Sequence, residues 1–325
     1  MHKILIIRFS SIGDIVLTTP VIRCLKAQLP FSEIHYLTKQ EYHQLLVANP
    51  YIDKIHLMED GLSALLPKLK AEHFNYIIDL HHNLRTLNLK ARLGLKIHSF
   101  PKLNIEKWIM VNFKYSKLPD KHIVDRYFET AKGLKIKNDG KGLDYFIPKH
   151  DEVDLSFLPP SHQNGYIGFV IGAKRITKQF PVDKIISVIK KMDQPVVLLG
   201  GTVDKEMGDK IKAEVGDLVY NSCGNFNINQ SASLIRQARK IITNDTGLMH
   251  IAAAFNKEII SIWGNTIPEF GMSPYMPQMP ANSHIMEVKG LKCRPCSKLG
   301  FDECPKGHFK CMNLIDEEEI VKLIS

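Results

Sequence analysis

The stretch that decides the fold is residues 240–254, which read KIITNDTGLMHIAAA. Its first residues form a short apolar run, its last residues are strong helix formers, and a glycine stands between them. This pattern predicts a strand, a tight turn and the N-terminus of a helix. The free amides of a first helical turn and the helix dipole bind anions, so Asp245, Thr246 and Gly247 form a candidate diphosphate site.

Two further residues bear on this turn. Gly247 lets a ligand approach the backbone closely, and His250 lies one helical turn along and can reach the same ligand. Asp245 can accept hydrogen bonds from sugar hydroxyls. The alternative is that Asp245 only caps the helix and His250 is only a half-buried helical residue. These residues alone leave both interpretations open.

Strand-like runs alternate with helical patterns on both sides of the boundary that we expect near residue 160. They lie at 4–9, 34–37, 54–58 and 76–80, and again at 166–171, 195–199, 240–243 and 258–263. Helices are predicted at 15–29, 183–192 and 231–239. Segment 148–165 carries three prolines and reads as a linker. The pattern predicts an α/β fold of two Rossmann-like domains, 1–160 and 161–325.

Ligands of such sheets bind at the carboxyl ends of the strands, so the loops there hold the candidate site residues. After the first strand comes Ser10-Ser11-Ile12-Gly13-Asp14, where Asp14 has the position of a general base or of a helix cap. Residues 172–181 contain three cations, Lys174, Arg175 and Lys178, which suit phosphate. Residues 200–206 offer glycines and the carboxylates of Asp204 and Glu206 for a ribose or base.

Charge and composition narrow the class of protein. The net charge is +9, and residues 1–150 hold 23 Lys and Arg against 14 acidic residues, whereas the rest is balanced at 20 against 20. A basic first domain indicates an anionic partner. We expect a cytoplasmic protein, because no signal peptide or membrane span is recognisable.

The motifs KILIIRFSSIGD at the N-terminus and TNDTGLMHIAAA at residue 243 together resemble glycosyltransferase family 9, the lipopolysaccharide heptosyltransferases, and the similarity covers nearly the whole chain. The resemblance implies a GT-B fold, with two Rossmann-like domains facing each other across a cleft. It implies an N-terminal acceptor domain and a C-terminal donor domain. The expected reaction is inverting transfer of a heptose from an ADP-sugar to a lipopolysaccharide or lipooligosaccharide core, with no cofactor required for catalysis.

Site residues follow from this resemblance position by position. Asp14 becomes the catalytic base. The expected donor contacts are Lys174, Arg175, Lys178, Asp204, Phe226, Asp245, Thr246, Gly247 and His250, with Phe226 beside the adenine. The expected acceptor contacts are Ser10, Ser11, Gly13, His81, Asn83 and Arg85. In some relatives two threonines stand where this chain has Ala173-Lys174, and Asp204 is the first choice for the ribose ligand ahead of Glu206.

A cysteine-rich segment spans residues 293–311. Cys293, Cys296, Cys304 and Cys311 have the spacing C-x2-C-x7-C-x6-C. Such a pattern is compatible with a structural zinc site, and reduced thiols or disulfides are the alternative.

Residues 104–117 hold a further set of apolar side chains. Ile105, Trp108, Ile109 and Phe113 recur at helical spacing between lysines. This spacing fits a helix lying on a membrane surface or a helix packed into the core. The acceptor is expected to be an anionic lipid-linked saccharide, with peripheral contact to the cytoplasmic face of the inner membrane.

Other functions remain to be weighed. One is a family member that uses another nucleotide sugar for a different surface glycan. A Rossmann-type oxidoreductase or epimerase should show a G-x-G-x-x-G fingerprint after the first strand, and the chain lacks it. A non-catalytic basic protein would leave the turns at Asp14 and Asp245 unexplained, and we expect no nucleic acid partner.

Overall fold

The computed structural model describes residues 2–59, 61–95 and 97–324. It forms two compact units, each built around one parallel sheet. The first comprises residues 1–102 and 121–148, and the second comprises residues 103–120 and 149–325. This division falls at residue 148 rather than at the expected 160, and it places residues 103–120 with the second unit.

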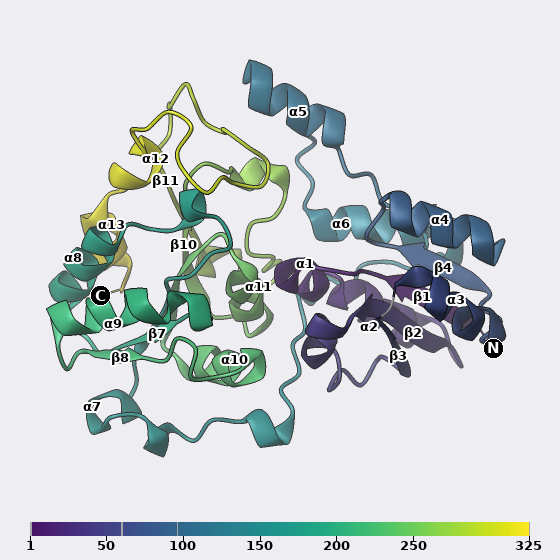
Figure 1. The fold of residues 1–325 in the computed structure, drawn as a ribbon, viewed down its shortest axis with the longest axis horizontal. Helices are drawn as coiled ribbons and strands as arrows, with labels where there is room; N and C mark the ends of the chain where they lie inside the picture. The colour runs from purple at the N-terminus through teal and green to yellow at the C-terminus, as the bar shows by residue number, and fades with distance from the viewer. Residues whose placement is uncertain (1, 60, 96, 325) are drawn as a thin grey trace. The chain divides into compact units, whose positions relative to one another are not determined.

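The first unit has a five-stranded sheet in the order β3-β2-β1-β4-β5, with every pair parallel. Its elements are β1 (Lys3–Ile7), α1 (Ile12–Val16), α2 (Thr19–Gln28), β2 (Glu33–Lys39), η1 (Gln40–Leu45), β3 (Lys54–Met58), α3 (Leu62–Ala71), β4 (Tyr76–Asp79), α4 (Leu84–Leu93), β5 (Ile97–Ser99), α6 (Ile123–Phe128) and η2 (Glu129–Leu134). Helices α3 and α4 lie side by side (Figure 1). Beneath them Leu5, Ile7 and Leu37 form a buried cluster with Leu69 and Leu89.

The second unit has a six-stranded sheet in the order β11-β10-β9-β6-β7-β8, again parallel throughout. Its elements are α5 (Asn104–Phe113), η3 (Lys149–Asp151), η4 (Leu155–Phe157), α7 (Pro160–Gln163), β6 (Ile167–Val170), η5 (Ile176–Lys178), α8 (Val182–Met192), β7 (Val196–Leu199), η6 (Thr202–Asp204), α9 (Lys205–Val215), β8 (Val219–Asn221), α10 (Ile228–Gln237), β9 (Lys240–Asn244), α11 (Gly247–Ala254), β10 (Glu258–Trp263), η7 (Pro268–Phe270), η8 (Pro280–Asn282), β11 (Ser283–Glu287), α12 (Lys310–Asn313) and α13 (Glu317–Ile324). The inner strands β6 and β7 are buried on both faces, as parallel strands covered by helices are, whereas the edge strand β11 is mostly half-buried or exposed.

The predicted strands are all present, but one predicted helix is wrong. Residues 15–29 were expected to form a single helix, and the structure has α1 and α2 with a break between them. Pro20 stands in the first turn of α2, where its missing N–H costs nothing. The hydroxyls of Thr18 and Thr19 bond to the carbonyls of Ile15 and Val16 at the break, at 2.6 and 2.8 Å.

Residues 104–113 form the helix α5 that both interpretations of residues 104–117 expect. None of its residues is fully buried; Ile109, Met110 and Val111 are half-buried, and Ile105, Trp108 and Phe113 are exposed, so core packing explains only part of its apolar side chains. Among the described residues, no helix combines the length and the apolar character needed to cross a membrane.

Candidate active site

Several of the predicted donor residues gather in the second unit, where β6 and β9 end. Asn244, the last residue of β9, is fully buried and joins the two loops. Its amide nitrogen donates to the carbonyls of Val170 and Ile171 at 3.3 and 3.0 Å, and its side-chain oxygen accepts from the Phe180 amide at 3.1 Å. The basic loop and the Asp245 turn are therefore held side by side.

Asp245 and Lys178 form an ion pair at this junction. The Lys178 Nζ lies 2.5 Å from Asp245 Oδ2, and both side chains are largely shielded from solvent. The hydroxyl of Thr266 also donates to Asp245 Oδ2, at 2.9 Å. Helix α11 begins at Gly247 directly after this pair, with Thr246 at its extended N-cap and His250 buried within it. A cation and a helix N-terminus thus lie together, which suits a diphosphate.

The remaining donor candidates differ in their surroundings. Lys174 is exposed, and Phe226 is half-buried in the loop before α10. Arg175 forms a bidentate pair with Asp302, at 2.9 and 2.8 Å, so its guanidinium is engaged with the cysteine-rich segment in this structure. Asp204 is buried and accepts from the Gly201 amide at 2.8 Å. Burial raises the pKa of Asp204 above its ordinary value.

The base candidate Asp14 lies in the first unit, in α1 just after β1. Its Oδ1 is 2.6 Å from Nη2 of Arg8, and its Oδ2 accepts from the Ser11 hydroxyl at 2.8 Å and from the Ser11 amide at 3.3 Å. Ser10 is half-buried and Gly13 is buried in the same turn. Arg8 was not predicted as a site residue, although a cation at the end of the apolar run 4–7 is a visible signal in the sequence.

Arg8 is buried and fixed from several sides. Its guanidinium donates to the carbonyls of Ser10 and Leu80, at 2.6 and 2.5 Å, and to the Tyr127 hydroxyl at 3.2 Å. Burial opposes the charge of Arg8, yet its pKa is raised because the attraction of Asp14 outweighs that cost. The pair is therefore ionised and rigidly held.

The acceptor candidates lie at the end of β4. His81 packs against Phe9 with ring centroids 4.8 Å apart, and burial together with the charge of Arg8 lowers its pKa to about 4. Its Nδ1 is buried with no hydrogen-bond partner among the described residues. Asn83 caps α4, because its Oδ1 accepts from the Thr86 amide at 3.0 Å. This bond gives Asn83 a structural task.

Arg85 is exposed and lines a cavity of about 900 Å³ that the sequence did not reveal. The cavity lies where β2 and β3 end and where α3 and α4 begin. Lys39 and Arg92 add two more cations to its wall, and Glu41 and Glu59 add two carboxylates. The wall thus carries three cations against two carboxylates, and Glu41 pairs with Lys39 at 3.4 Å.

The four clustered cysteines are near neighbours, because, besides burial, Cys296, Cys304 and Cys293 each contribute electrostatically to the raised pKa of Cys311. All six cysteines lie within the described residues, and each is a free thiol. Cys293 Sγ lies 3.8 Å from His308 Nε2, and Cys296 donates to the Cys293 carbonyl at 3.0 Å. Burial raises the pKa of Cys311 to about 11. The zinc prediction stays a prediction.

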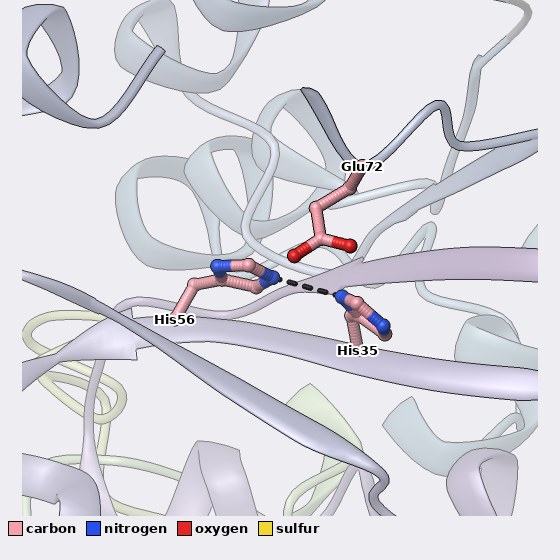
Figure 2. A group of neighbouring side chains, drawn as sticks. All are labelled: His35, His56 and Glu72. Atoms are coloured by element: carbon pink, nitrogen blue, oxygen red, sulfur yellow. Dashed lines mark hydrogen bonds between the residues drawn. The ribbon is translucent and has the colours of Figure 1, made fainter. Parts of the chain in front are cut away.

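Among the described residues, the group of three metal-ligating types that does gather is His35, His56 and Glu72 (Figure 2). His35 Nδ1 and His56 Nε2 are 2.8 Å apart. Glu72, however, is paired with the ammonium groups of Lys3 and Lys54, at 2.9 and 2.5 Å. Two cations on the only carboxylate of the group disfavour a metal ion, so we interpret it as a buried hydrogen-bonded pair of histidines.

The fold and the donor-side turn together define a nucleotide-sugar transferase of the GT-B class. Residues 62–299 match the family described as Glycosyltransferase family 9 (heptosyltransferase), and the chain belongs to this family. This confirms the resemblance seen in the two motifs. Membership makes the protein a glycosyltransferase rather than an oxidoreductase, an epimerase or a non-catalytic binding protein.

Three comparisons give the extent of the similarity. Lipooligosaccharide heptosyltransferase 2 of Haemophilus influenzae is 25% identical, with 92% of this chain and 93% of that protein covered. The glycosyl transferase family 9 structure from Veillonella parvula has a TM-score of 0.79 and 23% identity, covering 99% and 97% of the two chains. The E. coli heptosyltransferase WaaC, solved with ADP, has a TM-score of 0.69 and 18% identity, covering 99% and 100%. The GT-B fold is thereby confirmed.

Proposed function

We propose that this glycosyltransferase moves a heptose from ADP-heptose to the core of a lipopolysaccharide or lipooligosaccharide acceptor, with inversion at the anomeric carbon. The observation that carries the donor half is the Lys178–Asp245 pair at the N-terminus of α11. The activities for which the relatives are named support the heptose and the acceptor, and the ADP bound to WaaC supports the nucleotide.

The leaving group determines what the second unit must do. When the bond between the anomeric carbon and the diphosphate oxygen breaks, its electron pair stays on ADP. Lys178 and the amides at the start of α11 stabilise that developing charge, which is the task that a divalent metal performs in other transferases. Asp245 is then placed to accept hydrogen bonds from the sugar, and Thr266 fixes its orientation.

The attacking group determines what Asp14 must do. Asp14 takes the proton of an acceptor hydroxyl, and the oxygen attacks the anomeric carbon from the side opposite ADP. One displacement with one base inverts the configuration. Arg8 and Ser11 hold the carboxylate in place, so its geometry is set before substrate arrives.

The acceptor half rests on two features of the first unit. The cavity beside Arg85 offers cations to an anionic saccharide, and the buried Nδ1 of His81 lacks a hydrogen-bond partner among the described residues. A neutral imidazole suits a sugar hydroxyl, since it both donates and accepts. We place the reaction at the cytoplasmic face of the inner membrane, where a lipid-linked acceptor would be presented.

A donor screen tests the proposal. ADP-heptose should raise the melting temperature of the purified protein more than UDP- or GDP-sugars do. The Asp14→Asn variant should lose about 10² to 10⁴ in turnover while its affinity for ADP stays unchanged. Preference for another nucleotide would redirect the assignment to a different surface glycan, and near-normal turnover of Asp14→Asn would remove its role as base.

A further inference from the structure

Helix α5 exposes three of its six apolar side chains to solvent. Ile105, Trp108 and Phe113 are exposed by 72%, 57% and 67%. The rings of Trp108 and Phe113 contact one another, with centroids 5.5 Å apart. Lys107 is half-buried together with Ile109, Met110 and Val111, whereas the exposed side of the helix leaves Ile105, Trp108 and Phe113 in solvent.

The orientation of α5 is fixed by contacts from its other side and its ends. The Lys107 ammonium lies 5.7 Å from the ring centroid of Phe270, and Lys114 donates to the carbonyl of Pro295 at 2.6 Å. At the N-terminal end, Lys298 donates to the side chain of Asn104 at 3.3 Å. The outward direction of the apolar face is therefore set by the second unit itself.

The surface next to this face is basic. Residues 289–310, which supply Pro295 and Lys298, hold six Lys and Arg against two acidic residues. Residues 103–121 add four lysines against two acidic residues. Aromatic and aliphatic side chains bordered by lysines are the composition of a helix that lies in the headgroup region of an anionic bilayer.

The charge also decides between the candidate occupants of the face. A second copy of the chain would bring the same basic surface against itself, and the repulsion would oppose a symmetric contact. An anionic lipid surface attracts both basic segments at once. A membrane is thus the partner that satisfies the apolar and the charged features together.

We propose that α5 docks this protein onto an anionic bilayer, with Ile105, Trp108 and Phe113 entering the interface. The inference rests on the proposed function only in that a lipid-linked acceptor gives such docking a use. It names the element that would make the peripheral contact, and it does not depend on which sugar is transferred.

The two tryptophans make the test direct. Trp108 is exposed, whereas Trp263 is 1% exposed, so a change of emission on adding lipid reports α5. Vesicles of phosphatidylglycerol and phosphatidylethanolamine should shift the emission to shorter wavelength, and brominated acyl chains should quench it. Vesicles of phosphatidylcholine alone should do neither. The absence of a shift with anionic vesicles would overturn the proposal.

Variants on the apolar face complete the test while keeping the reporter. Ile105→Glu with Phe113→Glu should lower partition into anionic vesicles at least about tenfold, because two large apolar side chains are lost from the interface. The control is Phe157→Glu, an equally exposed aromatic in η4 of the same unit, which should bind as the unaltered protein does. Equal loss in the control would show that charge alone is responsible and would overturn the assignment to α5.

Two further measurements separate this inference from its alternatives. The α5 variants should keep their turnover on a water-soluble acceptor fragment, so failed docking is distinguishable from a failed assignment of the reaction. Light scattering in the absence of lipid should give the same mass for the variants and the parent. A dimer that dissociates only in the α5 variants would identify a second copy as the occupant instead.

Discussion

Replacing Lys178 with methionine should weaken ADP binding by about 10- to 150-fold. The ammonium lies 2.5 Å from Asp245 Oδ2, with only 18% of the lysine side chain exposed. A hydrogen bond to a charged group contributes about 1.5–3 kcal/mol, and this range converts to the factor given. Methionine keeps the apolar stem of the lysine, so the variant removes the charge with little loss of packing.

Asp245→Asn separates the two members of the pair. It removes a negative charge that competes with the diphosphate for Lys178, and the amide oxygen can still accept from Thr266. We expect ADP to bind as well as before or a few-fold more tightly, while turnover with the sugar nucleotide falls because the carboxylate no longer binds the sugar. Lys178→Met should therefore weaken ADP binding, whereas Asp245→Asn should not.

Isothermal titration calorimetry with ADP measures both effects. Lys190→Met is the matched control, since Lys190 is exposed on α8 in the same unit and its loss changes the net charge equally. Thermal unfolding should show that each variant is folded. The reasoning is refuted if Lys178→Met binds ADP like the Lys190 control, because Lys178 would then serve only to neutralise Asp245.

Three further predictions concern stability. Arg8→Met should cost about 3–5 kcal/mol in the free energy of unfolding, because it leaves Asp14 without its guanidinium, and Arg8→Lys should recover part of the loss in denaturant titrations. Burial, and then the proximity of His35, lower the pKa of His56 to about 4, so the folded state keeps this ring neutral. The contribution of neutral His56 to the free energy of unfolding is complete above the ordinary histidine pKa near 6.5, and it falls by up to about 3 kcal/mol as the pH drops toward 4. When unfolding is measured across this pH range, His56→Gln should reduce the dependence of the free energy of unfolding on pH. If the cysteine-rich segment binds zinc, protein purified without added metal should contain one equivalent of zinc, and a chelator should lower its melting temperature. Six titratable thiols in protein that contains no metal would instead favour reduced, metal-free cysteines.

The strands were the most predictable part of the fold. A run such as residues 240–243 is apolar on both faces because helices cover both sides of a parallel sheet, and this composition is visible in the sequence. Strands β5 and β8 have three residues each and lack such a run, so they went unnoticed. The break between α1 and α2 was not predicted, because proline is compatible with the first turn of a helix. The sequence therefore did not show whether Pro20 stands in the first turn of a helix that begins at residue 15 or of one that begins at Thr19.

The site was predictable where chemistry follows a strand directly. Lys178 and Asp245 were both chosen from their loops, and the structure brings them into contact. The contact between Lys178 and Asp245 depends on Asn244, which holds their two loops together. Asn244 was not predicted, because no local sequence pattern identifies a buried amide. The partnership of Arg175 with Asp302 joins residues 127 positions apart, and no periodicity encodes a contact of that kind.

The cysteine-rich segment gains a role that does not depend on a metal. Thr177, next to Lys178, accepts from the Phe301 amide at 2.7 Å and donates to the Phe301 carbonyl at 2.9 Å. The same segment holds α5 through Pro295 and Lys298. One stretch of chain thus supports both the donor loop and the proposed membrane helix. Because loops without regular structure depend on such contacts for their rigidity, disturbing the segment should affect ADP binding and the orientation of α5 together. The segment therefore has a structural task that does not depend on whether its cysteines bind an ion.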